Sequence, residues 1–171
     1  MDIAQNDHHS PGFEIYRQGG TTDPITLTIR LVIVARRWRS LIDEHLRHIG
    51  QSAARMEAMS AIINMPGPNA QVDIARRLRI EGPTMTRMLD TLEKDGLVER
   101  LPHPTDRRTK HLRVTPAGEA ALANIFIIVD GLRNRLLHDL PPEEVAAASG
   151  FLETLMGRLD AGLPDPSSDL E

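Results

Sequence analysis

The sequence contains no cysteine, few aromatic residues and no long apolar run. The absence of cysteine excludes disulfide bonds and any sensing chemistry that needs a thiol. Aromatic residues make up only 3% of the chain, so any ligand pocket has few rings for stacking. No apolar stretch is long enough to cross a bilayer, and the N-terminus lacks the basic-then-apolar pattern of a signal peptide. We therefore expect a cytoplasmic protein with no membrane partner.

The charge is unevenly distributed along the 171 residues. The net charge of −4 argues against a uniformly basic nucleic-acid-binding protein. Between Gln71 and Arg113, however, ten Lys or Arg residues face seven Asp or Glu residues, a local charge of +3 that leaves −7 for the remainder. An acidic body with a basic surface can direct DNA to one face. The alternative interpretation is a merely solvated charged surface.

A helix with one apolar and one polar face is predicted from Pro83 to the glycine at position 96. Proline is tolerated in a first helical turn, and Gly96 suits the left-handed conformation that ends a helix. The apolar positions recur at three- and four-residue spacing: Met85, Met88, Leu89 and Leu92. The polar positions are Thr84, Thr86, Arg87 and Thr91. Short hydroxyls and a guanidinium fork suit base edges and phosphates in a major groove.

A second short helix is predicted just before it, from Ala70 to Leu78. Its expected buried positions are Val72, Ile74, Ala75 and Leu78, and its outward cations are Arg76, Arg77 and Arg79. We expect Asn69 to cap this helix. Two short helices with a tight connection form a helix-turn-helix, which places its second helix in DNA.

Two short segments, 97–101 and 110–114, follow with a partly alternating pattern that predicts a β-hairpin. Prolines and Asp106 between them indicate a turn. Asp106 can pair with Arg107 or Arg108 and hold its fork, which leaves the other arginine for a minor groove. Lys110 adds a cation at the base of this tip. The expected DNA-binding set is therefore Thr84, Thr86, Arg87, Thr91, Asp106, Arg107, Arg108 and Lys110.

These residues carry a family resemblance. The run LRIEGPTMTRMLDTLEKDGLVER, followed by DRRTKHLRVTPAG, resembles the MarR family of transcription regulators, and within it the SlyA-like branch. Upstream, LVIVARRWRSLIDEHL resembles the first helix of that branch, so the match covers about residues 27–160. The resemblance implies a homodimeric repressor that binds a palindromic operator and is released by a small aromatic or phenolic ligand. One departure is Arg79, where many relatives have glycine in the turn.

The predicted fold class is mostly α with a small β-hairpin wing (α+β), a winged helix-turn-helix with a helical dimerisation bundle. We expect a flexible N-terminal extension over 1–23, a MarR-type domain over 24–161 and an acidic tail over 162–171. Within the domain, the dimerisation helices span about 24–48 and 116–160, and the winged helix-turn-helix about 52–115. The first helix should begin at Asp23, and its apolar seam is typical of helix packing: Leu27, Leu31, Val34, Trp38 and Leu41. A second stripe of apolar side chains, facing inward, is predicted on the last helix.

The resemblance places a ligand cleft between the first two helices and the DNA-reading part. The matching positions are Trp38, Arg55, Met56 and Met59. Arg55 could hold an aromatic carboxylate by a bidentate pair, or it could be a surface arginine. Trp38 could equally be a core anchor.

Other chemistries are less well supported. His45 and His48 could share a metal, but the alternative is a solvated helix end, and we expect no metal and no cofactor. We find no nucleophile–base–acid set and no glycine-rich phosphate loop, so we expect no enzyme. A ligand-independent architectural or anti-silencing DNA-binding protein remains the alternative function.

Overall fold

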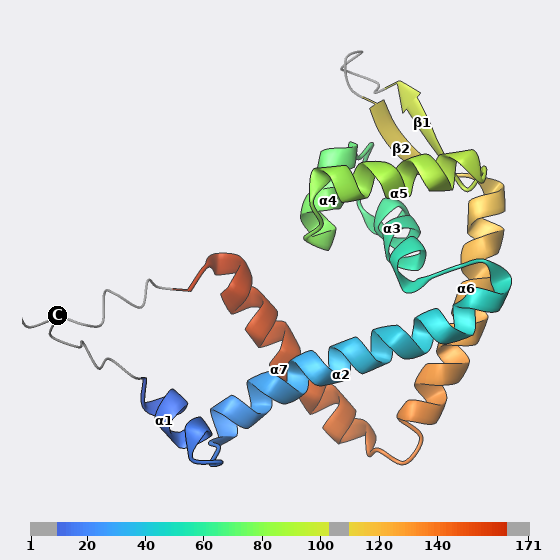
Figure 1. Cartoon of the computed structure of the whole chain (residues 1–171). Coiled ribbons are helices and arrows are strands. Elements are labelled where there is room, and N and C mark those ends of the chain that lie inside the picture. Colours follow the sequence, from blue (N-terminus) through green and yellow to red (C-terminus); the bar gives the residue numbers. More distant parts are fainter. Residues whose placement is uncertain (1–9, 103–109, 164–171) are drawn as a thin grey trace, which may run out of the picture. The chain divides into compact units, whose positions relative to one another are not determined.

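A computed structural model gives the fold of the protein and describes residues 10–102 and 110–163 (Figure 1). Helices account for 73% of the described residues, and the sheet found in these ranges is a two-stranded antiparallel hairpin. The predicted class, mostly α with a small hairpin, is confirmed. No helix in these ranges is long and apolar enough to cross a membrane.

The elements follow one another in the order α, then a hairpin, then α. Their bounds are α1 Pro11–Arg17, α2 Asp23–Leu46, the 3-10 turn η1 Arg47–Ile49, α3 Ala53–Asn64, α4 Gln71–Leu78, α5 Gly82–Lys94, β1 Val98–Pro102, β2 Lys110–Val114, α6 Pro116–Leu136 and α7 Pro142–Ala161. The chain divides into two compact units, residues 1–128 and 129–171, and α6 contributes to both.

In the first unit, α3 is the central helix. It contacts α2, α4 and β2, while α5 contacts α4 and β1. Arg39 of α2 donates two hydrogen bonds to the carboxylate of Glu57 on α3, at 2.6 and 2.9 Å. The fully buried side chains of this unit include Leu46, Met59, Ile74, Met85, Leu89 and Leu92. Each such side chain stabilises the fold by roughly 1.5–3 kcal/mol, so α5 is held firmly by its apolar face.

The hairpin pairs Val98 with Val114 at one end and Pro102 with Lys110 at the other. The predicted strands therefore agree with β2 and differ from β1 by one residue at each end. The hairpin is also tied to the segment before α4, because the Leu112 amide donates to the Asn69 carbonyl at 3.0 Å.

The predicted capping role of Asn69 is wrong. The residue that caps α4 is Ala70, whose amide donates to the Asp73 carboxylate at 3.1 Å. Asn69 is buried, and its side-chain amide donates to the carbonyls of Met65 and Gly67. A buried amide must satisfy its hydrogen bonds inside the protein, and Asn69 does so by holding the loop that precedes α4.

The start of α6 packs closely on the end of β2. Thr115 caps the helix, since its hydroxyl accepts from the Gly118 amide at 3.0 Å. The same hydroxyl donates to the Gly96 carbonyl at 2.6 Å. A side chain at Gly118 would collide with the backbone, because an ideal Cβ there would lie 2.0 Å from the Leu97 oxygen. In the motif TPAG, Thr115 therefore caps α6, Pro116 occupies its first turn, and Gly118 allows the helix to approach the Leu97 backbone closely.

Several local expectations need correction. Helix α1 was not predicted within the 1–23 extension; the Ser10 hydroxyl caps it by accepting from the Phe13 amide at 3.1 Å. Helix α2 begins at Asp23 as expected, and Thr22 occupies its N-cap position. Val72 was expected in the core and is 59% exposed. It lies where α4 has no neighbour to cover it, a property that helical periodicity cannot reveal.

Apolar side chains are also exposed along two longer helices of the single chain. On α2 these include Leu27, Leu31 and Val34 from the predicted seam. On α7 the expected inward stripe is largely exposed at Leu152, Met156 and Leu159. Helix α7 has no buried residue at all.

Candidate nucleic-acid interface

Helix α5 presents a polar face opposite a fully buried one. Thr84, Thr86, Arg87 and Thr91 are all exposed, whereas Met85, Leu89 and Leu92 are completely buried. Pro83 lies in the first turn, and Gly96 adopts a left-handed φ of 71° just beyond the helix. The division into two faces predicted from the sequence is therefore present.

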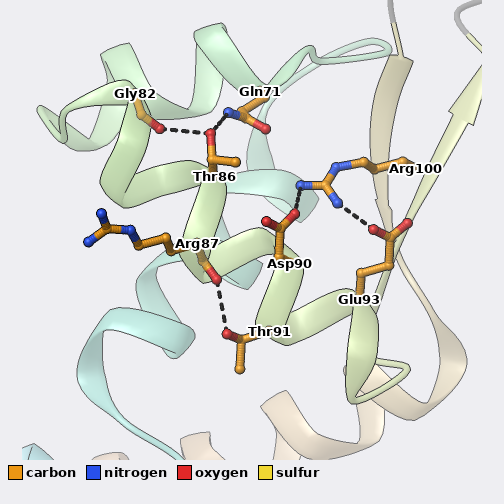
Figure 2. A network of polar contacts seen from close by, with 8 residues as sticks. All are labelled: Gln71, Gly82, Thr86, Arg87, Asp90, Thr91, Glu93 and Arg100. Atoms are coloured by element: carbon orange, nitrogen blue, oxygen red, sulfur yellow. Dashed lines mark hydrogen bonds and ion pairs between the residues drawn. The ribbon is translucent and has the colours of Figure 1, made fainter.

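Two of the predicted hydroxyl groups already donate inside the protein. The Thr86 hydroxyl donates to the Gly82 carbonyl at 3.0 Å and accepts from the side-chain amide of Gln71 at 2.6 Å (Figure 2). The Thr91 hydroxyl donates to the Arg87 carbonyl at 2.9 Å. A hydroxyl has one hydrogen and two lone pairs. Thr86 and Thr91 can therefore accept from a ligand, but they can donate only if an internal bond breaks.

Arg87 is the exposed cation of this face. Within residues 10–102 and 110–163, its guanidinium makes no hydrogen bond or ion pair, and Figure 2 shows it directed away from the other labelled side chains. A free planar fork matches guanine edges and phosphate oxygens. Lys110, at the start of β2, is also exposed.

A second arginine, Arg100, lies beside the same helix but is already paired. It extends from β1, donates to Asp90 at 2.7 Å and also hydrogen-bonds Glu93, both on α5 (Figure 2). Partial burial lowers the pKa of Arg100, but the hydrogen bonds and charges of Asp90 and Glu93 outweigh it and raise this pKa overall. Sequence analysis missed this cluster. The i, i+3 spacing of the two carboxylates was the available signal.

Other cations of this region are also paired. Arg113 donates to Glu99 across the hairpin at 2.7 Å, and Arg76 lies 3.4 Å from the Asp73 carboxylate. Arg79 takes a left-handed φ of 53°, at the position where the family resemblance led us to expect glycine. The local charge of +3 is therefore not spread evenly over the surface.

Three residues of the predicted DNA-binding set belong to the wing tip. Asp106, Arg107 and Arg108 lie outside the described residues. Their role in DNA binding stays a prediction from the sequence. The hairpin that carries the tip does contact α5 through β1.

The predicted ligand residues lie on α2 and α3, and they differ in exposure. Trp38 and Met56 are partly buried, while Met59 is completely buried. Arg55 donates to the Gln51 amide oxygen at 3.0 Å and to the Asp95 carboxylate at 2.7 Å. With a side chain only 16% exposed, Arg55 joins α3 to the residue that follows α5.

Neither cavity that the structure describes is lined by these four residues. One of about 360 Å³ is lined by Ile49, Gln51, Ala121, Asn124, Ile127 and Ile128. Another of about 470 Å³ lies at the start of α2 and is lined by Asp23, Pro24, Thr26, Leu27 and Arg30. The two cavities are mostly apolar.

The candidate metal residues make no cluster. The His45 ring nitrogen Nδ1 lies 3.0 Å from the Leu41 carbonyl, one turn earlier on the same helix. Across the part of the chain that the structure describes, no group of three or more His, Asp or Glu side chains could hold a metal ion.

Comparisons with known proteins agree with this geometry. A model of the MarR family matches residues 52–110. The crystal structure of the transcriptional regulator PA3341 is 32% identical, with a TM-score of 0.71, and the match covers 79% of this chain and 98% of that one. A mutant of MarR from E. coli complexed with operator DNA is 28% identical, with a TM-score of 0.69 over 78% and 95% of the two chains. The S. aureus MepR–DNA complex shares the fold, with 21% sequence identity and a TM-score of 0.67. That match covers 76% of this chain and 96% of the MepR chain.

The matched segment begins just before α3 and runs through α4, α5 and β1. These are the elements that carry the polar face and its supporting core. The chain belongs to the MarR family of winged-helix transcription regulators.

Proposed function

We propose that the protein is a homodimeric repressor that binds an inverted-repeat operator through α5 and is released by a small aromatic ligand. The observation that carries the proposal is the exposed polar face of α5, opposite completely buried Met85, Leu89 and Leu92. On this face Arg87 has no partner among residues 10–102 and 110–163. Two similar proteins, MarR from E. coli and MepR from S. aureus, have been solved with DNA. A DNA-binding role also agrees with the cytoplasmic location that we expect from the sequence.

Exposed apolar side chains on α2 and α7 support the homodimer. Val34 on α2 and Leu159 on α7 are 62% and 64% exposed in the single chain. Several large apolar side chains exposed along one helix mark an interaction surface. A two-fold axis would place two copies of α5 about 34–36 Å apart, which is one turn of DNA, so the operator should be an inverted repeat.

The pair between Arg55 and Asp95 supports a route from ligand to DNA. Asp95 directly follows α5, and its carboxylate lies 2.7 Å from the Arg55 guanidinium. We propose that an aromatic carboxylate binds beside Trp38, Met56 and Met59. Its carboxylate replaces that of Asp95 as the ion-pair partner of Arg55. The end of α5 then loses its link to α3. Release follows if the ligand binds the DNA-incompetent state more tightly.

A ligand-independent architectural role is the second candidate. It is favoured by the ion pair of Arg55, because the charge of this arginine is already matched by Asp95.

The test is fluorescence anisotropy with a labelled fragment of the protein's own promoter and an unrelated fragment of equal length. Titrations at two salt concentrations, with and without a panel of aromatic carboxylates, separate the candidates. We expect tight, salt-sensitive binding to the promoter fragment alone, relieved by one compound. Promoter-specific binding that no compound alters favours the architectural role. Equal affinity for both fragments contradicts the proposed sequence-specific operator. A monomer in analytical sedimentation at the concentration of the binding assay contradicts the proposed homodimer.

A further inference from the structure

The exposed face of α5 carries acidic residues beside the predicted DNA-binding residues. Asp90 lies three residues after Arg87 and four before Lys94, so all three share one face of the helix. The side chains of Asp90 and Glu93 are 59% and 43% exposed. If α5 enters a groove of DNA, two uncompensated carboxylates on this helix would repel the phosphate backbone.

Arg100 is placed to cancel both charges. It lies in the middle of β1, opposite Leu112, and its side chain is only 17% exposed. One terminal nitrogen binds Asp90 at 2.7 Å and the other binds Glu93 (Figure 2). A planar guanidinium fork can hold two carboxylates at once, whereas the point charge of a lysine cannot match that geometry.

The same contacts fix the hairpin to the helix. Arg100 belongs to β1, and both of its carboxylate partners belong to α5, so its two ion pairs join the hairpin to that helix. Since both terminal nitrogens are engaged and little of the side chain is exposed, Arg100 is poorly placed to bind a phosphate itself.

We propose that Arg100 is a positioning residue of the DNA interface, which neutralises Asp90 and Glu93 and holds β1 against α5 without contacting DNA. The inference rests on the proposed DNA-binding function. It changes the expected use of the basic hairpin, because a cation counted toward DNA binding then acts on the protein's own acids. The field that DNA meets on α5 is then set by Arg87 and Lys94.

A double-mutant cycle tests this proposal with anisotropy on the promoter fragment. The four proteins are the wild type, Arg100→Gln, the double variant Asp90→Asn/Glu93→Gln, and the triple variant with all three changes. We expect Arg100→Gln to weaken DNA binding by about tenfold in the wild-type background, within the range of couplings between contacting residues. In the neutral background the same change should cost less than about twofold, because no unpaired carboxylate is left behind.

Each alternative gives a different pattern. An equal loss in both backgrounds means that Arg100 contacts DNA, and this overturns the proposal. No loss in the wild-type background also overturns it, because the acids then do not meet the DNA. A double variant that binds more weakly than the wild type means that Asp90 or Glu93 contacts bases directly, which is the third contrary result.

Arg113→Gln is the matched control. Arg113 belongs to the same hairpin and is paired with Glu99, but its side chain is 62% exposed and it touches neither acid of α5. Its effect on affinity should be the same in both backgrounds. If Arg100→Gln unfolds, as judged by circular dichroism, Arg100→Lys replaces it. That variant keeps the charge and loses the fork, and we expect a smaller loss of about threefold that the neutral background again removes.

The failure of the proposed function looks different. A wild-type protein that binds no DNA overturns the proposed function together with this inference. A wild-type protein that binds its operator without coupling between position 100 and the two acids overturns the inference alone.

Discussion

Replacing Gly118 by alanine should destabilise the protein, because two neighbours already occupy the space. An added Cβ would lie 2.0 Å from the Leu97 carbonyl oxygen and 2.6 Å from a Val114 methyl carbon. Relief requires α6 to move away from Leu97, whose carbonyl also accepts from the Thr115 amide at 3.0 Å. Overpacking of this kind costs about 1–3 kcal/mol. A clash this close to a backbone oxygen falls at the upper end of that range. Alanine regains about 1 kcal/mol through helix propensity, so we expect a net loss of roughly 2 kcal/mol.

Gly131→Ala is the control, because Gly131 belongs to the same helix and, apart from adjacent residues and the backbone of that helix, no described atom lies within 4 Å of the point that an added Cβ would occupy. It should stabilise the protein by roughly 0.5–1 kcal/mol. Urea denaturation of the two variants and the wild type, followed by circular dichroism, gives the comparison directly. If Gly118→Ala is as stable as the wild type, the close approach of α6 to Leu97 does not require glycine, and the reasoning is refuted.

Three further predictions concern the turn, the wing and the ligand route. Arg79→Gly should raise the free energy of unfolding by roughly 0.5–1 kcal/mol in urea denaturation, because glycine adopts the left-handed φ of 53° without steric cost; a loss would show that contacts of the arginine outweigh this strain. Arg107→Ala and Arg108→Ala should each weaken operator binding and lower its salt dependence by about one phosphate contact, and unchanged slopes in both would remove the wing from the interface. Asp95→Asn should tighten the binding of an aromatic carboxylate measured by calorimetry, because Arg55 loses its competing anion; an unchanged affinity places the ligand away from Arg55.

The elements that could be predicted are those whose signals are local. Pro83 and Gly96 bracket α5, and the Thr115–Pro116 pair starts α6, because caps and turn residues act on neighbouring backbone groups. The apolar face of α5 was equally accessible, since its spacing follows the helical period. These signals fixed the order of helices and strands and the side of α5 that faces outward.

The elements that could not be predicted depend on neighbours distant in the sequence. Val72 shares the apolar spacing of α4 but has no partner over it, so periodicity assigned it to the core wrongly. The link between Arg55 and Asp95 spans 40 residues. Helix α1 depends on a seven-residue segment that begins with proline, too short for a periodic signal.

The availability of positive charge for DNA binding is the functional property that a count from the sequence describes least well. A count over residues 71–113 treats every cation alike and yields a local excess of +3. The structure divides them, because Arg100 and Arg113 are bonded to carboxylates while Arg87 makes no such pair in the described ranges. A paired arginine contributes little to the field at a distance, since its charge is cancelled within a few ångströms. Among the described residues, fewer cations are therefore available to attract DNA than the count implies, and Arg87 on the exposed face of α5 is one of them.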